Sequence, residues 1–175
     1  MWNFKFALAL LLLCSIVSSC NSDKDVYDNI MQMKSKPITL SCDSMRLISY
    51  KNKVDTLPKQ FYWVVYSDSV DCSSCRLTNL VHWNDFNSVG FRFIFSPSQS
   101  DIGTFMCTAG NLKFSTQVYL DSANIFARQN QHIPNDVLFR TFLLDENMNV
   151  VLVGDPIRNK EINEIFWDIL NGKEY

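Results

Sequence analysis

The chain has 175 residues, a length that fits one domain with a short appendage. Its 16 basic and 18 acidic residues give a formal charge of −2, which argues against a nucleic-acid-binding protein because such proteins need a basic surface. The chain is 47% hydrophobic and has only five glycines and five prolines, which excludes collagen-like and low-complexity sequence. We therefore expect a compact globular domain that binds no nucleic acid.

The N-terminal residues have the pattern of a targeting signal. Residues 6–17 are apolar except for Ser15, and they follow the basic residue Lys5. This run is too short to cross a bilayer core of about 30 Å as a helix, but it suits the core of a signal peptide. It ends in VSSC at residues 17–20, which resembles the lipobox of bacterial lipoproteins. The resemblance implies that residues 1–19 are removed and that Cys20 carries the lipid. The alternative is an ordinary secreted protein with a chance cysteine.

Residues 20–36 are expected to connect this anchor to the folded domain. They are polar, with Val26, Ile30 and Met33 at helical spacing. We predict a flexible tether with one or two helical turns, followed by a single domain over residues 37–175. A lipid-anchored protein of this kind would lie in the cell envelope, at the periplasmic face of a bacterial membrane or at the outer membrane.

Strands and helices alternate along the remaining chain. Strands are predicted at residues 37–40, 45–50, 61–66, 91–95, 117–121, 140–145 and 150–154. Helices are predicted at residues 101–107, 123–129 and 159–170, and directly after the strand 61–66, with Leu77, Leu80, Val81 and Asn84 on one face. The first two strands form an edge or hairpin, and the last two form a hairpin. This order predicts an α/β sandwich with a mixed sheet.

The most informative motif is the C-x-x-C of Cys72 and Cys75, where the strand 61–66 meets the following helix. Two cysteines at this spacing can form a strained, reducible disulfide, and the helix N-terminus stabilises the thiolate of Cys72. Cys75 lies one turn further on, where we expect it to be more buried and able to attack a mixed disulfide at Cys72. A structural disulfide, half of a zinc site and a copper-chaperone site remain as alternatives. The two metal sites lack partners, because only His82 and His132 are present.

A strand, this motif, a helix, the residues FLLDENMNVVLVGDPI at 142–157 and a terminal helix resemble the thioredoxin fold. The extra strand near Val118 and the helix near Phe126 resemble the TlpA-type membrane-tethered thiol–disulfide oxidoreductases. The resemblance implies a thioredoxin-like α/β fold whose central mixed sheet is flanked by helices. It implies that Cys72 attacks and Cys75 resolves, with protein thiol or disulfide clients and an upstream redox donor. No cofactor and no metal are expected, and we expect a monomer.

The sequence departs from that family at three places beside the motif. Asp71 stands where members carry an aromatic residue, Tyr66 replaces a buried acidic residue of some members, and no proline occurs near Phe139, where a cis-proline normally precedes the hairpin. Pro134 lies five residues before that position. The residues around the cysteines and the missing proline are the candidates for client docking, namely Asp71, Arg76, Phe139, Arg140 and Thr141.

Other interpretations concern the remaining polar and sulfur side chains. Cys42 and Cys107 are expected to pair in a second disulfide or to lie buried as free thiols. Ser69 stands three residues before Cys72, as a hydroxyl residue does in peroxiredoxins, which leaves peroxidase activity as an alternative. Against it, the upstream proline of peroxiredoxins is here Val65. The main rival from another class is a non-catalytic lipoprotein that acts as a binding or assembly module. In that case the C-x-x-C would be only a structural disulfide.

Overall fold

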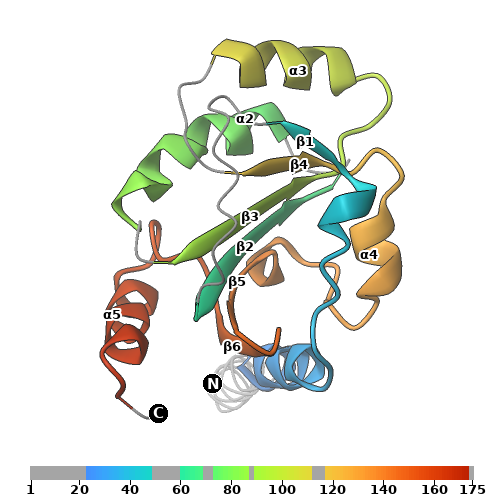
Figure 1. The fold of residues 1–175 in the computed structure, drawn as a ribbon. Coiled ribbons are helices and arrows are strands. Elements are labelled where there is room, and N and C mark those ends of the chain that lie inside the picture. Colours follow the sequence, from blue (N-terminus) through green and yellow to red (C-terminus); the bar gives the residue numbers. More distant parts are fainter. Residues whose placement is uncertain (1–22, 49–59, 69–72, 87–88, 112–116, 174–175) are drawn as a thin grey trace, which may run out of the picture.

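The structure is a computed structural model, and it describes residues 23–48, 60–68, 73–86, 89–111 and 117–173 (Figure 1). Several sequence expectations fall outside these ranges. They concern the signal peptide, Cys20, Ser69, Asp71 and Cys72. Within the described ranges no helix is both long and apolar enough to span a bilayer.

The described strands form one mixed sheet of six, in the order β1-β4-β3-β2-β5-β6. The central strands β2, β3 and β4 are parallel, while β1, β5 and β6 run antiparallel to their neighbours. The strand bounds are β1 (Arg46–Ile48), β2 (Phe61–Ser67), β3 (Gly90–Phe95), β4 (Val118–Leu120), β5 (Thr141–Asp145) and β6 (Val150–Val153). The predicted α/β fold with a mixed central sheet is confirmed.

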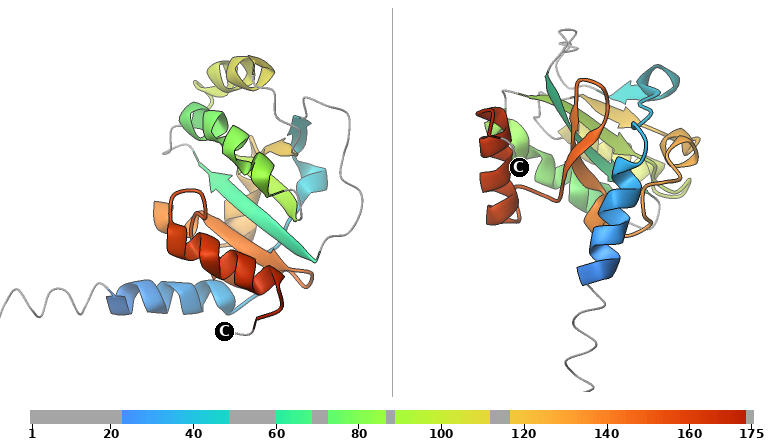
Figure 2. Two further views of the ribbon diagram at one scale, coloured as in Figure 1. Left: turned by 90° about the vertical axis from the view of Figure 1, so that its left-hand side faces the viewer. Right: turned by 90° about the horizontal axis from the view of Figure 1, so that it is seen from below.

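Helices cover both faces of the sheet (Figures 1 and 2). One face carries α2 (Ser73–Thr78), the 3₁₀ segment η2 (Asn79–Asp85), α3 (Ile102–Asn111) and α5 (Lys160–Leu170). The other carries the helix of residues 23–34, α4 (Ile125–Gln129) and the 3₁₀ turn η3 (Val137–Phe139). A further 3₁₀ turn, η1 (Cys42–Ser44), precedes β1. The central sheet therefore separates two helical layers.

The central strand β2 owes its position to a continuous apolar run. A strand that is covered on both faces needs apolar residues at every position, not at alternate ones. Trp63 of β2 is fully buried, and its ring lies 5.5 Å from that of Trp83 and 5.4 Å from that of Phe166, centroid to centroid. These aromatic contacts attach η2 and α5 to the same point of the sheet.

The N-terminal segment is more ordered than the one or two helical turns that the sequence predicted. Residues 23–34 form a continuous helix, and Met33 at its end is fully buried against the sheet. Residues 37–40 are not a strand, which rules out the hairpin alternative, whereas β1 within residues 45–50 lies at the edge of the sheet, as the other alternative predicted. Instead the side chain of Asn130 accepts a hydrogen bond from the Thr39 amide at 2.8 Å and donates one to the Thr39 carbonyl oxygen at 3.0 Å. One asparagine thus provides the pairing that a neighbouring strand would have given.

The helix after β2 is shorter than predicted, because α2 ends at Thr78 and continues as the 3₁₀ segment η2. A 3₁₀ helix has three residues per turn, so side chains three apart lie on one face. Leu77, Leu80 and Trp83 are accordingly buried. Val81, which the α-helical pattern placed on the buried face, is 39% exposed.

Candidate active site

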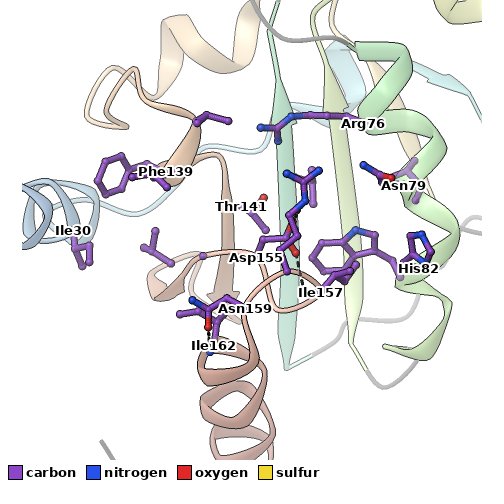
Figure 3. A pocket seen from close by; sticks show the side chains of 18 of the residues that line it. Ile30, Arg76, Asn79, His82, Phe139, Thr141, Asp155, Ile157, Asn159 and Ile162 are labelled. Carbon is purple, nitrogen blue, oxygen red and sulfur yellow. Dashed lines mark hydrogen bonds and ion pairs between the residues drawn. The ribbon is translucent and has the colours of Figure 1, made fainter.

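A cleft of about 710 Å³ lies beside α2 (Figure 3). Arg76, Asn79, His82 and Trp83 line it from α2 and η2, and Thr141 and Gly154 line it from the sheet and the loop that follows β6. Residues of the turn before α5, of η3 and of the helix 23–34 complete its walls. Three separate parts of the chain therefore meet at the helix that carries Cys75.

Cys75 lies in the first turns of α2 and is disulfide-bonded. Its side chain is exposed, so the burial that we expected at this position is not observed. Its neighbour Arg76 lines the cleft, and Arg76 Nη1 donates a hydrogen bond of 3.4 Å to the carbonyl oxygen of Tyr66 at the end of β2. The second cysteine of the motif is thus accessible to a reagent or partner that approaches the rim of the cleft.

A buried ion pair lies where β2 leaves the sheet toward the motif. Arg140 Nη1 lies 2.6 Å from Asp68 Oδ1, and the two side chains are only 6% and 17% exposed. Arg140 Nη2 also donates a hydrogen bond to Asn135 Oδ1 at 3.1 Å, and its guanidinium lies 5.6 Å from the centre of the Tyr66 ring. The pair neutralises the Asp68 carboxylate, which precedes the C-x-x-C motif in the sequence.

Tyr66 stands at the position where some members of the resembling family bury an acid. Its side chain is 6% exposed, and its hydroxyl donates a hydrogen bond to Asn124 Oδ1 at 3.2 Å. Burial and the nearby Asp68 carboxylate raise the pKa of Tyr66 to about 12, although Arg140 acts in the opposite direction. The phenol therefore stays neutral at physiological pH and supplies no general base.

The three docking candidates at the start of β5 lie at different places. Phe139 and Thr141 line the cleft, and both side chains are almost fully buried. Arg140 points to Asp68 and is not among the residues that line the cleft. No peptide bond among the described residues is cis, which includes the bond before Pro134. The Arg140 carbonyl oxygen, directly before β5, accepts a hydrogen bond of 2.8 Å from the Tyr66 amide.

Cys42 and Cys107 are both free, so of the two alternatives left open by the sequence the free thiols are observed and the second disulfide is not. Cys42 is half-buried and Cys107 is exposed on α3, which also contradicts a buried role for Cys107. Burial raises the pKa of the Cys42 thiol, and nearby Arg92 partly offsets this increase. In the described part of the chain, no cluster of three or more His, Cys, Asp or Glu side chains could hold a metal ion.

Sequence reasoning missed two parts of the cleft. Gly154 and Asp155 follow β6, and the positive φ of 126° at Gly154 turns the chain into the cleft. Val26 and Ile30 reach the cleft from the N-terminal helix. The helical spacing of Val26, Ile30 and Met33 was the available signal, since a tether without packing partners has no need of an apolar stripe.

No family model matches the chain, and no curated protein matches it by sequence. Solved structures match it at low identity. Mycobacterium tuberculosis AhpC is 16% identical with a TM-score of 0.42, and the match covers 67% of this chain and 76% of that one. An uncharacterized thioredoxin-like protein from Porphyromonas gingivalis is 17% identical with a TM-score of 0.44, covering 73% and 86% of the two chains. A mutant of Xylella fastidiosa PrxQ is 13% identical with a TM-score of 0.44, covering 79% and 96%.

At such identities a structural likeness concerns the fold alone, and the strand order carries the assignment. The chain runs from β2 through α2 to the parallel strand β3, and later through the antiparallel hairpin β5–β6 to α5. In the sheet, β2 lies between β3 and β5. The chain has a thioredoxin-like fold.

Proposed function

We propose that the protein is a thiol–disulfide oxidoreductase of the cell envelope that uses Cys72 and Cys75 to exchange disulfides with protein clients. The observation that carries this proposal is the position of Cys75. It is exposed and disulfide-bonded, it lies on the helix that follows the central strand of a thioredoxin-like sheet, and it stands next to a residue that lines a cleft. A cysteine kept only as a structural staple is more often shielded from solvent.

The reducing direction balances as two successive exchanges. The Cys72 thiolate attacks one sulfur of a client disulfide, the client S–S bond breaks, and the other client sulfur leaves as a thiolate that takes up a proton. Cys75 then loses its proton and attacks the Cys72 sulfur of the mixed disulfide, which releases the second client sulfur. The client gains two electrons and two protons, and an upstream dithiol donor returns the oxidised pair to its reduced state.

The electrostatics favour a reductant. A stabilised thiolate makes a dithiol pair more oxidising, but α2 is only six residues long, so its dipole is weaker than that of a long helix. Asp71 adds a carboxylate beside Cys72, while Asp68 is neutralised by Arg140. We therefore expect a potential nearer to that of thioredoxin (about −270 mV) than to that of DsbA (about −120 mV).

Equilibration with glutathione buffers tests this direction. The pair should be fully oxidised at the poise of DsbA, and Asp71→Ala should raise its potential by lowering the pKa of the Cys72 thiol. A wild-type pair that is already fully reduced at that oxidising poise would assign the protein to the oxidising side instead.

The division of labour between the cysteines is tested by single substitutions. Cys72→Ser should abolish insulin reduction and mixed-disulfide formation, because it removes the attacking sulfur. Cys75→Ser should instead accumulate the mixed disulfide, because nothing resolves it. Cys107→Ser removes an exposed thiol outside the motif and serves as the matched control, which should behave as wild type. Equal trapping by the two motif variants, or trapping by neither, would contradict the catalytic assignment.

The membrane anchor is part of the same proposal and rests on VSSC at residues 17–20. Two or more acyl chains at about 0.8 kcal/mol per buried methylene would hold the protein stably on a bilayer. Cys20→Ala should block lipidation and signal removal, which mass spectrometry of the N-terminal peptide reports. Wild-type protein recovered without acyl chains and with a different N-terminus would show that the protein is not a lipoprotein.

One observation favours a second candidate, a non-catalytic binding module. Arg140, a docking candidate next to Phe139, is held in a buried ion pair with Asp68 and does not line the cleft. A module of this kind would bind a partner in the cleft and keep the motif oxidised. It would then show partner binding that is unchanged in Cys72→Ser and Cys75→Ser.

A further inference from the structure

One end of the cleft is apolar and is formed by the N-terminal helix and η3. Its lining residues carry no charge, and they are Val26, Ile30, Val137, Leu138 and Phe139. Val26 is 40% exposed, Val137 53% and Leu138 61%. Large apolar side chains that face a cleft and remain so exposed mark a surface that gains free energy when a partner covers it.

We call this apolar end of the cleft, formed by the helix 23–34 and η3, the wall. The domain holds it in place before any partner arrives. Met33 in the last turn of the helix and Ile38 just after it are buried in the core, and the Ile38 amide donates a hydrogen bond of 2.8 Å to the carbonyl oxygen of Met148. Asn130 binds both backbone groups of Thr39. The helix 23–34 is therefore fixed against the domain, and a partner that docks there does not have to order it.

One cleft extends from this apolar end to α2, the helix that carries Cys75. Figure 3 shows Ile30 and Phe139 on one side and Arg76, Asn79 and His82 on the other, with Thr141 between them. Arg76 follows Cys75 directly in α2. A chain that lies across the cleft from η3 to α2 would bring its own sulfur toward the helix that carries Cys75.

We infer that the helix 23–34 and η3 form a docking surface for client protein, in the form of an extended, unfolded segment with large apolar side chains near its cysteine. This inference rests on the proposed redox function. A cleft of about 710 Å³ holds several side chains of an extended chain, since ligand pockets typically measure about 300–1,000 Å³. The apolar end of the cleft carries no charge and therefore calls for apolar side chains in the part of the segment that it holds.

Two other occupants fit the observations less well. A second copy would meet the cleft with the same concave face, and a two-fold interface needs a self-complementary surface. A membrane surface would meet the carboxylates of Asp23, Asp25 and Asp28, which surround Val26 on its helix. Anionic lipids repel such a cluster.

The test uses the mature full-length protein in detergent and two variants of the wall, Val26→Asp and Leu138→Asp. Both side chains are substantially exposed, so the fold should tolerate the change. Tyr27→Asp is the matched control, because Tyr27 is 62% exposed on the same helix and does not line the cleft. Two extended peptides serve as probes, one with leucine and one with serine on either side of a cysteine, each as a mixed disulfide with glutathione.

Wild type and Tyr27→Asp should react about tenfold or more faster with the leucine peptide, as expected from burying one or two such side chains. Val26→Asp and Leu138→Asp should lose this preference, measured within each variant as the ratio of its rates with the two peptides. An unchanged preference in both wall variants would overturn the docking role. Absence of reaction with glutathione in wild type would instead contradict the proposed redox function.

Docking is also measured without redox chemistry, by fluorescence anisotropy with the leucine peptide whose cysteine is replaced by serine. Binding should fall at least tenfold in the two wall variants and remain in Tyr27→Asp. Equal binding by all four proteins would overturn the inference. A wild-type dimer that dissociates in Val26→Asp would also overturn it, because the surface would then bind a second copy. Vesicle binding that the wall variants lose, while their peptide binding persists, would overturn it in favour of a membrane surface.

Discussion

Arg140 forms a buried ion pair with Asp68. Removing one partner of a buried pair leaves the other charge without compensation, so Arg140→Gln should cost about 3 kcal/mol of unfolding free energy. Arg158 offers a matched control, because it pairs with Asp155 at 3.6 Å with its side chain 70% exposed. Arg158→Gln should cost less than about 1 kcal/mol. Urea unfolding of both oxidised variants provides the measurement. Equal losses of unfolding free energy would show that the buried Arg140 pair stabilises the fold no more than the exposed Arg158 pair.

Gly154 is predicted to tolerate no side chain. Its φ is 126°, and a Cβ atom there would lie 3.0 Å from Ile162 Cγ1. Gly154→Ala should therefore destabilise the protein by about 1–3 kcal/mol. Gly110→Ala is the control, because Gly110 lies in α3 with open space around it, and alanine there should stabilise by about 0.5–1 kcal/mol. Thermal unfolding of the two variants compares them, and a tolerated Gly154→Ala would contradict the geometry of this loop.

The raised pKa of Tyr66 leads us to expect that the unfolding free energy falls at alkaline pH. Its pKa is raised to about 12 in the folded protein, mainly by burial and then by Asp68, from 10.0 in the unfolded chain. The unfolded state therefore loses this proton first, so stability is unaffected below about pH 10 and falls as the pH rises toward about 12. Tyr66→Phe should remove that part of the slope. Unfolding free energies of both proteins between about pH 9 and pH 12 test the sign, and identical slopes would contradict it.

The central strands were predictable because their apolar runs have no other stable arrangement. A continuous run such as residues 61–66 can only lie between two covering layers. The helix α5 was predictable at both ends as well. Asn159 caps it by accepting the Ile162 amide at 3.0 Å, and Gly172 follows it with a φ of 74°.

Elements stabilised by distant partners were less predictable. The change from α2 to η2 depends on which side chains pack against the sheet. The sequence pattern is compatible with an α-helix nearly as well as with the observed 3₁₀ segment. The segment 37–40 has the composition of an edge strand, but its backbone partner is the side chain of Asn130, which lies ninety-one residues away from Thr39. No local pattern reports such a pairing.

Asn130 is predicted to control how the N-terminal helix is attached. Asn130→Ala removes the two hydrogen bonds to Thr39 and a third, of 2.8 Å, to the Phe126 carbonyl oxygen. The buried groups left unpaired should cost about 1–3 kcal/mol. Hydrogen exchange in residues 23–40 should therefore accelerate while the sheet stays protected.

Gln32→Ala is the control for that experiment, since it removes one exposed hydrogen bond of the same helix, to the His132 carbonyl oxygen. It should leave the exchange of residues 23–40 nearly unchanged. Acceleration of the same size in both variants would mean that Asn130 has no special role in fixing the helix.

At the scale of the whole molecule, the C-x-x-C motif locates only part of the candidate site. The C-x-x-C at residues 72–75 and the hairpin region pointed to the part of the sheet beside which the cleft lies. The cleft also needs Val26 from one end of the chain and Gly154 from the other. These two residues carry no chemical signature, and only the folded chain brings them together.

The redox activity of the motif is tested most directly by counting accessible thiols. Cys42 and Cys107 are free and would add to the count, so the measurement uses the full chain with Cys42→Ser and Cys107→Ser. The protein is reduced mildly, alkylated without denaturant and analysed by mass spectrometry of the peptides that carry Cys72 and Cys75. We predict that mild reduction opens the pair and that Cys72 is alkylated rapidly in the native protein. A pair that resists mild reduction, with both cysteines protected until the protein is denatured, would contradict the proposed function.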